Sequence, residues 1–152
     1  MKIKVGLSRN STPLSKLIRL FTNSQVSHCF ILINDETVLH AGFPYVMGWY
    51  YQNFLKHNVV VATFEVEVPE WRVKWAYAQA GKTYGWVTLF GMLFVLLGKR
   101  LKINIKNPFP DNEGTYICSE FAARVIGYPN SEDISPQDLL EYLESNYGQP
   151  KT

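Results

Sequence analysis

The feature that most constrains the fold is a change in the spacing of the apolar residues near Val68. Before it, they alternate or run without interruption over short segments, which is typical of strands, with one helical segment among them. Beyond it, they recur at helical spacing. The predicted strands cover residues 3–7, 27–33, 37–41 and 58–68. The predicted helices cover residues 13–22, 70–80, 87–97, 118–126 and 136–143. This order favours an α+β fold, in which an antiparallel β-sheet packs against helices.

Length and composition are those of one globular domain. The 152 residues are 47% apolar and 18% charged, which excludes a disordered chain, and no repeat or Gly/Ser-rich linker divides them. We therefore expect a single domain over residues 1–152. A net charge of +2 does not favour nucleic acid as a partner, and two cysteines cannot form a disulfide framework. The chain begins with a predicted strand and has no apolar signal segment there, so we expect a cytoplasmic protein.

The longest apolar stretch, Trp86–Leu97, has twelve residues. A membrane-spanning helix needs about 20, so this stretch predicts a buried or half-buried core helix, and a segment at a lipid interface is the alternative. Gly98 is expected to end the helix. Residues 99–106 carry four basic side chains in eight, which predicts a solvated edge strand, with an anion-binding patch as the alternative.

Two histidines lie on consecutive predicted strands, and the turn between the strands decides whether they meet. A three-residue connection, 34–36, pairs Ile33 with Thr37 and places His28 and His40 on the same face of the sheet. A two-residue turn would shift the register by one residue and place the two imidazoles on opposite faces. The sequence leaves both registers open.

Cys118 lies where a loop becomes a helix. The free amides of a first helical turn favour a thiolate and can also stabilise an oxyanion. With an imidazole as base and a second polar group to orient it, such a thiol is equipped for nucleophilic catalysis. Cys118, His28 and His40 are therefore the candidate catalytic residues, and no cofactor is needed.

Zinc is the competing interpretation. The possible donors are Cys29, Cys118, His28, His40 and His57. His28 and Cys29 are consecutive on a strand, so their side chains point to opposite faces and cannot both bind one ion. No Cys-x-x-Cys spacing exists either, so no metal site is expected. The same alternation predicts that Cys29 is buried on the side opposite His28 and Cys118.

Several segments resemble the circularly permuted NlpC/P60 papain-like amidases, a group that includes the YiiX-like proteins and the lecithin–retinol acyltransferase-like enzymes. The segments are Ser27-His28-Cys29-Phe30-Ile31, Val38-Leu39-His40-Ala41, Gly81-Lys82-Thr83-Tyr84-Gly85, Tyr116-Ile117-Cys118-Ser119-Glu120-Phe121 and Ile134-Ser135-Pro136-Gln137-Asp138-Leu139. The likeness extends from about Val5 to Leu143. The residues after Cys118 are similar to the YiiX-like branch, whereas a histidine at position 40 is similar to the acyltransferase branch.

The resemblance implies a permuted papain-like fold with Cys118 as nucleophile, His28 as base and His40 as the third polar residue. It implies a cysteine hydrolase that cleaves an amide (peptide or isopeptide) bond, with cell-wall peptides as the first expected substrate. One alternative is a thioester-forming acyltransferase or lipase acting on lipid acyl groups. The apolar helix and the basic residues after it, Lys99, Arg100 and Lys102, would then contact anionic lipid. The other alternative is a non-catalytic binding module of the same fold.

Overall fold

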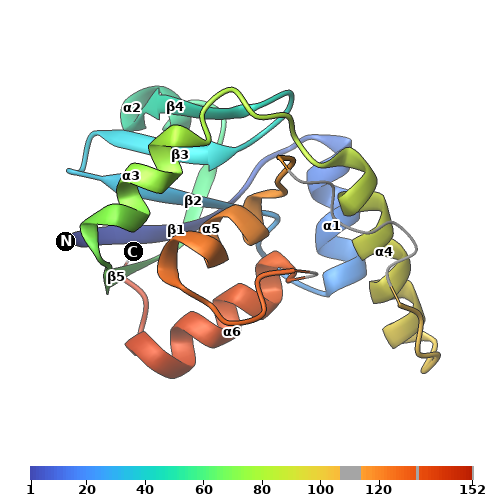
Figure 1. Cartoon of the computed structure of the whole chain (residues 1–152). Helices are drawn as coiled ribbons and strands as arrows, with labels where there is room; N and C mark the ends of the chain where they lie inside the picture. Colours follow the sequence, from blue (N-terminus) through green and yellow to red (C-terminus); the bar gives the residue numbers. More distant parts are fainter. Residues whose placement is uncertain (107–113, 133, 152) are drawn as a thin grey trace.

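A computed structural model of the chain describes residues 1–106, 114–132 and 134–151. Within these residues, five strands form one antiparallel sheet in the order β4-β3-β2-β1-β5 (Figure 1). The strands are β1 (Lys2–Arg9), β2 (His28–Ile33), β3 (Thr37–Ala41), β4 (Val46–Tyr50) and β5 (Val59–Glu67). The fold class is α+β with an antiparallel sheet, which confirms the prediction made from the order of the apolar patterns.

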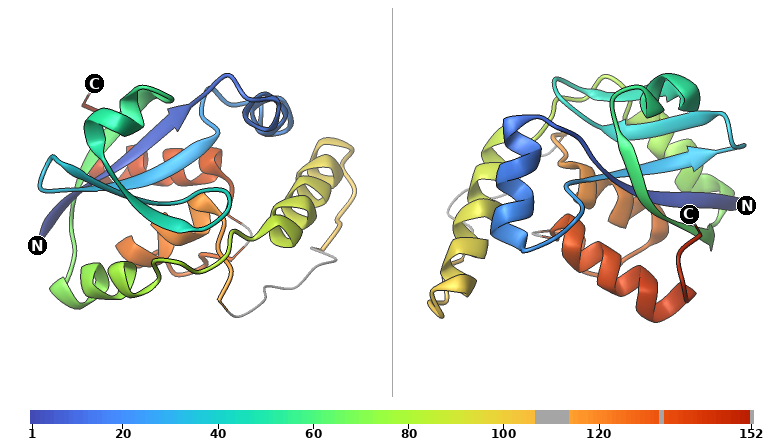
Figure 2. Two further views of the ribbon diagram at one scale, coloured as in Figure 1. Left: turned by 90° about the horizontal axis from the view of Figure 1, so that it is seen from above. Right: turned by 180° about the vertical axis from the view of Figure 1, so that it is seen from behind.

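Six helices in this described part of the chain pack around the sheet. They are α1 (Pro13–Thr22), α2 (Tyr51–Leu55), α3 (Glu70–Ala78), α4 (Trp86–Arg100), α5 (Cys118–Ile126) and α6 (Pro136–Tyr147). Helices α3, α5 and α6 lie on one side of the sheet, and the short α2 lies on the other (Figure 1 and Figure 2). Helices α1 and α4 lie side by side at one end of the molecule.

The main core lies between the sheet and the helices of the α5 side. Val5 and Leu7 of β1, which lies between β2 and β5, are completely buried there, as is Phe121 of α5. A smaller cluster on the opposite face joins the sheet to Phe54 of α2, and its sheet members are Phe30, Leu32 and Val38. Strands β2 and β3 are therefore covered on both faces of the sheet. This explains why their sequences are nearly continuous apolar runs.

The turn between β2 and β3 has three residues, as one of the two predicted registers requires. Ile33 pairs with Thr37, and the ladder continues through Leu32 with Val38. Asn34 and Asp35 adopt left-handed conformations, with φ of 54° and 57°. Asn and Asp tolerate this region better than most residues, which fits them to the connection.

The predicted helix caps are present. Thr12 accepts a hydrogen bond from the first turn of α1, and Asn23 ends that helix in the left-handed conformation. Ser135 and Asp138 form a reciprocal capping box at the start of α6. Gly127 ends α5 with φ of 82°, a backbone conformation that favours glycine.

The sequence interpretation missed two elements, β4 and α2. In β4 only the first residue, Val46, is buried, because β4 is the edge strand of the sheet, so no alternation marks it. Helix α2 has five residues and no side-chain cap, and only Phe54 among them is buried. Elements this short and this exposed leave no periodic signal in the sequence.

Gly98 does not end α4, which continues to Arg100. A Cβ at Gly98 would lie 2.8 Å from Ile105 Cγ1, so this glycine permits close packing of the segment that folds back on the helix. The edge strand predicted at 99–106 is wrong, because Lys99 and Arg100 form the last turn of α4 and the residues after Leu101 adopt no strand. Across the described ranges, no helix has the length and apolar character required to cross a bilayer.

Candidate active site

His28 and His40 meet on one face of the sheet, just beyond the last paired residues of β2 and β3, Ile31 and Leu39. His28 Nε2 and His40 Nδ1 are 3.0 Å apart and share a hydrogen bond. The two rings are nearly perpendicular, with 5.0 Å between their centroids. The same-face arrangement follows from the three-residue turn, since a shift of one residue would have separated the rings.

His40 is packed between aromatic rings and is only 6% exposed. The ring of Trp49 lies 5.4 Å away and that of Phe54 5.5 Å away, both edge-on. Gly42 makes room for it, because a Cβ there would lie 2.9 Å from His40 Nδ1. Burial, reinforced by the charge of His28, lowers the pKa of His40 to about 3. His40 is therefore a neutral imidazole near pH 7.

Cys118 is the first residue of α5, and it is 3% exposed. The residue before it, Ile117, has no side chain that can cap the helix, so the N-cap position supplies no oxygen to the amides of the first turn. These amides give the helix end a partial positive charge. A sulfur at this position is next to donors that favour a thiolate and that can also bind a developing oxyanion.

Cys29 lies on the α5 side of β2, so the expectation that it points away from Cys118 is wrong. It is completely buried, as expected, but its thiol lies next to the thiol of Cys118, and each of the two thiols shifts the pKa of the other. Strand alternation places Cys29 with Ile31 on this face. His28 is the first residue of β2, and from the end of the strand its imidazole also acts on Cys118 and lowers the pKa of that thiol.

The two thiols differ in acidity. Hydrogen bonding from the Cys29 thiol is the largest influence that holds the pKa of Cys118 well below its ordinary value, and the charge and hydrogen bond of His28 add to it, against the effect of burial. Burial, together with the charge of Cys118, raises the pKa of Cys29 well above its ordinary value. Cys118 is therefore the sulfur that ionises, and Cys29 stays protonated and donates to it.

A cavity of about 390 Å³ opens over the two histidines. Its lining includes His28, His40, Phe43, Trp49, Tyr84 and Trp86. Tyr84 lies at the Cys118 side of this cavity: burial raises its pKa most, and the charges of Cys118 and Cys29 raise it further. Tyr84 and His28 thus line the cavity and also lie close to the sulfur of Cys118. Sequence reasoning assigned no role to Tyr84 or to the Cys29 thiol, and no spacing pattern marks either of them.

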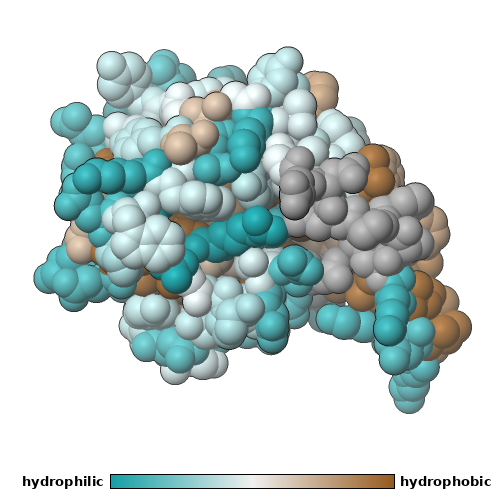
Figure 3. Space-filling model, in the orientation of Figure 1, coloured by the Kyte–Doolittle hydropathy of each residue, from teal (hydrophilic) through white to brown (hydrophobic). Residues whose placement is uncertain are grey.

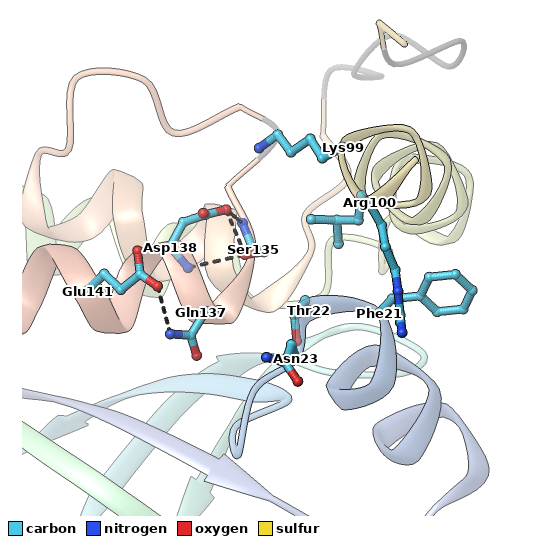
Figure 4. A pocket seen from close by; sticks show the side chains of 10 residues that line it. Phe21, Thr22, Asn23, Lys99, Arg100, Ser135, Gln137, Asp138 and Glu141 are labelled. Atoms are coloured by element: carbon cyan, nitrogen blue, oxygen red, sulfur yellow. Dashed lines mark hydrogen bonds between the residues drawn. The ribbon is translucent and has the colours of Figure 1, made fainter. Parts of the chain in front are cut away.

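A second cavity, of about 500 Å³, lies between the ends of α1 and α4 and the start of α6 (Figure 4). Lys99 and Arg100 line one side and Asp138 and Glu141 the other. Its lining holds no thiol and no imidazole, so it offers none of the chemistry of the first cavity.

The zinc interpretation gains no support from the geometry. Residues 1–106, 114–132 and 134–151 contain no group of three or more His, Cys, Asp and Glu side chains that could hold a metal ion. His57, one of the five candidate donors, is exposed at the cavity.

The structure therefore brings together all three residues singled out in the sequence. His28 hydrogen-bonds His40, and it lies near enough to Cys118 to lower the pKa of that thiol, so the three residues lie next to one another. Comparison of the sequence with protein-family models gives no match, and comparison with curated proteins gives none either.

Proposed function

We propose that the chain is a cysteine hydrolase of the permuted NlpC/P60 papain-like type, which cleaves an amide bond through an acyl-enzyme on Cys118. The observation that carries this proposal is that Cys118, at the start of a helix, lies next to His28, which in turn hydrogen-bonds His40. A nucleophile, a base and an orienting group in this order are what acyl transfer requires. Peptide and isopeptide bonds are the proposed substrates, with cell-wall peptides first among them.

In the proposed reaction, the Cys118 thiolate attacks the carbonyl carbon, and the carbonyl oxygen becomes an oxyanion. The first-turn amides of α5 lie next to the sulfur and supply donors for that oxyanion. The protonated imidazole of His28 gives its proton to the leaving amine, and the C–N bond breaks to leave a thioester. Water, deprotonated by His28, then attacks the thioester carbon and releases the carboxylic acid and the thiol.

His40 orients His28 in this scheme. Because His28 uses Nε2 for the bond to His40, its Nδ1 is the nitrogen left for Cys118. A protonated His28 donates through Nε2 to the neutral His40 Nδ1, which places the proton of His40 on its own Nε2. That nitrogen is buried and has no hydrogen-bond partner among the described residues. His40 can thus accept a proton from His28 only at a high energetic cost. His40 therefore holds the His28 ring in place, and His28 remains the base.

Lipid acyl groups are the second candidate substrate. The cavity wall facing solvent contains Phe43 and Trp86, whose rings are 5.2 Å apart. Phe43 is 68% exposed, so an apolar surface borders the entrance. An acyl chain would be accommodated there better than a charged peptide. The thioester step is unchanged, and the acceptor would be an alcohol or amine in place of water.

The first test is selective alkylation of the intact chain with iodoacetamide at about pH 6.5, read by peptide mass spectrometry. Cys118 should react much faster than Cys29, and the rate should fall in the His28→Ala variant. Cys118→Ala serves as the matched control, since it removes the proposed nucleophile and keeps the Cys29 thiol, so that only slow labelling should remain. Equal, slow labelling of both cysteines would contradict the proposal and favour a non-catalytic binding module.

The second test identifies the acyl group. Intact-mass measurement after incubation with peptide and with lipid acyl donors should show an adduct on the wild type that is absent from Cys118→Ala. An adduct from the peptide donor supports the amidase, and one from the lipid donor supports the acyltransferase. An adduct that persists in Cys118→Ala would contradict both.

A further inference from the structure

A third cavity has a lining in which every Lys, Arg, Asp or Glu side chain is basic. It has a volume of about 390 Å³ and lies between the end of β1, helix α1 and the end of α2. We call it the basic cavity, and its basic lining residues are Arg9, Lys16, Arg19 and Lys56. Hydrophobic residues gather instead over α4 in the space-filling view (Figure 3), and α4 supplies no residue to this cavity.

Neighbouring carboxylates do not neutralise the positive charge of the basic cavity. Within the part of the chain that the structure describes, the ion pairs use other Lys and Arg residues. Lys56 donates to the amide oxygen of Asn53, and Arg19 donates to the carbonyl oxygen of Ser15, and both acceptors are uncharged. Residues 1–60 hold six basic and only two acidic side chains. Because like charges held together repel, a bound anion would stabilise this arrangement.

The basic cavity adjoins the cavity over His28 and His40, which we call the histidine cavity. Asn10, His57 and Asn58 line both cavities, and Asn10 Nδ2 donates to Asn58 Oδ1 at 3.4 Å across this shared wall. The lining of the histidine cavity contains no Lys, Arg, Asp or Glu residue. A molecule that extends through both cavities would therefore place an uncharged part beside the imidazoles and an anionic part beside the four cations.

The number and type of the cations favour phosphate over carboxylate as the anion. A phosphate monoester carries a charge of about −1.5 to −2 near pH 7 and offers three acceptor oxygens, whereas a carboxylate carries one charge. Arg9 and Arg19 each present a planar fork of donors, which matches two phosphate oxygens at once, and the two lysines add point charges. A cavity of this volume accommodates one such group rather than a polymer.

We infer that the basic cavity is a phosphate-binding subsite, which holds a phosphate group of the substrate while the bond to be cleaved lies in the histidine cavity. The link to the substrate rests on the proposed function, whereas phosphate binding itself does not. The subsite would fix the position of the substrate at a point remote from the sulfur, so its residues contribute to specificity and take no part in the bond-breaking steps.

The first test is titration of the ¹⁵N-labelled full chain with inorganic phosphate and with acetate at constant ionic strength, followed by the NMR shifts of the backbone amides. Phosphate should cause saturable shifts around the four basic residues, and acetate should bind roughly tenfold or more weakly. Acetate binding as tight as phosphate binding, phosphate shifts confined to other parts of the chain, or the absence of saturable shifts would overturn the inference.

Two pairs of substitutions test the cations independently. Arg9→Gln with Arg19→Gln, and Lys16→Gln with Lys56→Gln, should each weaken phosphate binding roughly tenfold or more. Lys16 and Lys56 are exposed, so the lysine pair keeps the test valid if the arginine pair impairs folding.

Lys2→Gln with Lys102→Gln is the matched control, because it removes the same charge from two exposed residues that line neither cavity. This variant should bind phosphate as the wild type does, and equal weakening by the control and the lysine pair would overturn the inference. Cys118→Ala should also bind phosphate fully, so a failure of the proposed catalysis and a failure of the subsite can be told apart.

The source of the phosphate group is tested with two esters. N-acetylphosphoethanolamine is a water-soluble phosphate ester that carries an amide, and dihexanoylphosphatidylglycerol, used below its micelle concentration, carries a lipid headgroup. One of them should bind more tightly than inorganic phosphate and shift amides of both cavities, and the one that does identifies the source. If neither ester shifts the amides of the histidine cavity, the assignment of the phosphate to the substrate is wrong.

Discussion

The buried neutral His40 should make the protein sensitive to mild acid. In the folded chain its pKa is about 3, against 6.5 for an ordinary histidine. Between these two values the unfolded chain binds a proton at this position and the folded chain does not. The free energy of unfolding must therefore fall as the pH falls below 6.5, and the effect is complete only near pH 3.

The expected size follows from these two values. At pH 5 the unfolded state gains about 2 kcal/mol from protonation of this one side chain, because the pH is then about 1.5 below the ordinary pKa and each pH unit contributes about 1.4 kcal/mol. That is a substantial part of the 5–15 kcal/mol roughly typical of a folded domain. His40→Asn cannot bind the proton, so the variant should lose about 2 kcal/mol less than the wild type between pH 7 and pH 5.

Urea unfolding followed by tryptophan fluorescence at both pH values measures this difference. The comparison uses only the change with pH, so any loss that the substitution causes at pH 7 cancels. His57→Asn is the control, because His57 is exposed and its removal should leave the acid sensitivity unchanged. If the wild type and His40→Asn lose the same free energy on acidification, His40 is not buried as a neutral imidazole and its orienting role fails.

Three further predictions concern substitutions of the site residues. Cys118→Ala and His28→Ala should each abolish turnover, while His40→Ala should lower the rate on the order of 10–100-fold. If the His40→Ala variant is folded but as inactive as Cys118→Ala, then His40 is the base. Cys29→Ala should raise the pKa of Cys118 in alkylation–pH profiles, and Cys29→Ser, which keeps a donor, should raise it less; identical profiles for all three chains would contradict the donor role. Gly42→Ala should displace the His40 ring and slow turnover like His40→Ala, with little change in melting temperature; an unchanged rate would show that the ring tolerates the shift.

Much of the fold was accessible from sequence because its signals are local. The caps at Thr12 and Ser135 and the glycine at 127 depend on a few neighbouring residues, and all are present in the structure. The pairing of the two histidines depended on one turn, whose three-residue length the sequence allowed but did not decide. Gly98 misled the prediction because a glycine required by close tertiary packing looks the same in sequence as one that ends a helix.

The site was predicted in its members but not in its surroundings. Strand parity correctly separated His28 from Cys29, yet the conclusion that Cys29 lies far from Cys118 was wrong. Parity describes the two faces of a strand but not its end, where His28 contacts Cys118 together with Cys29. Tyr84 belongs to the site because the segments before α4 and before α5 come together, Tyr84 with Tyr116. Such long-range contacts leave no trace in residue spacing.

The placement of Cys118 at the start of α5 also ties its reactivity to folding. The partners that favour the thiolate, Cys29 and His28, belong to a strand about 90 residues earlier in the chain, so the sulfur meets them only when α5 has packed on β2. Most buried thiols become more reactive when a protein unfolds. This one should become less reactive in mildly acidic solution, because loss of α5 packing returns its pKa to the ordinary range. By the same linkage, ionisation of Cys118 stabilises the packed helix at high pH, and that contribution is lost as the pH falls through the lowered pKa. In the proposed reaction, a nascent chain that carries the thiol without its packed helix would therefore not be acylated prematurely.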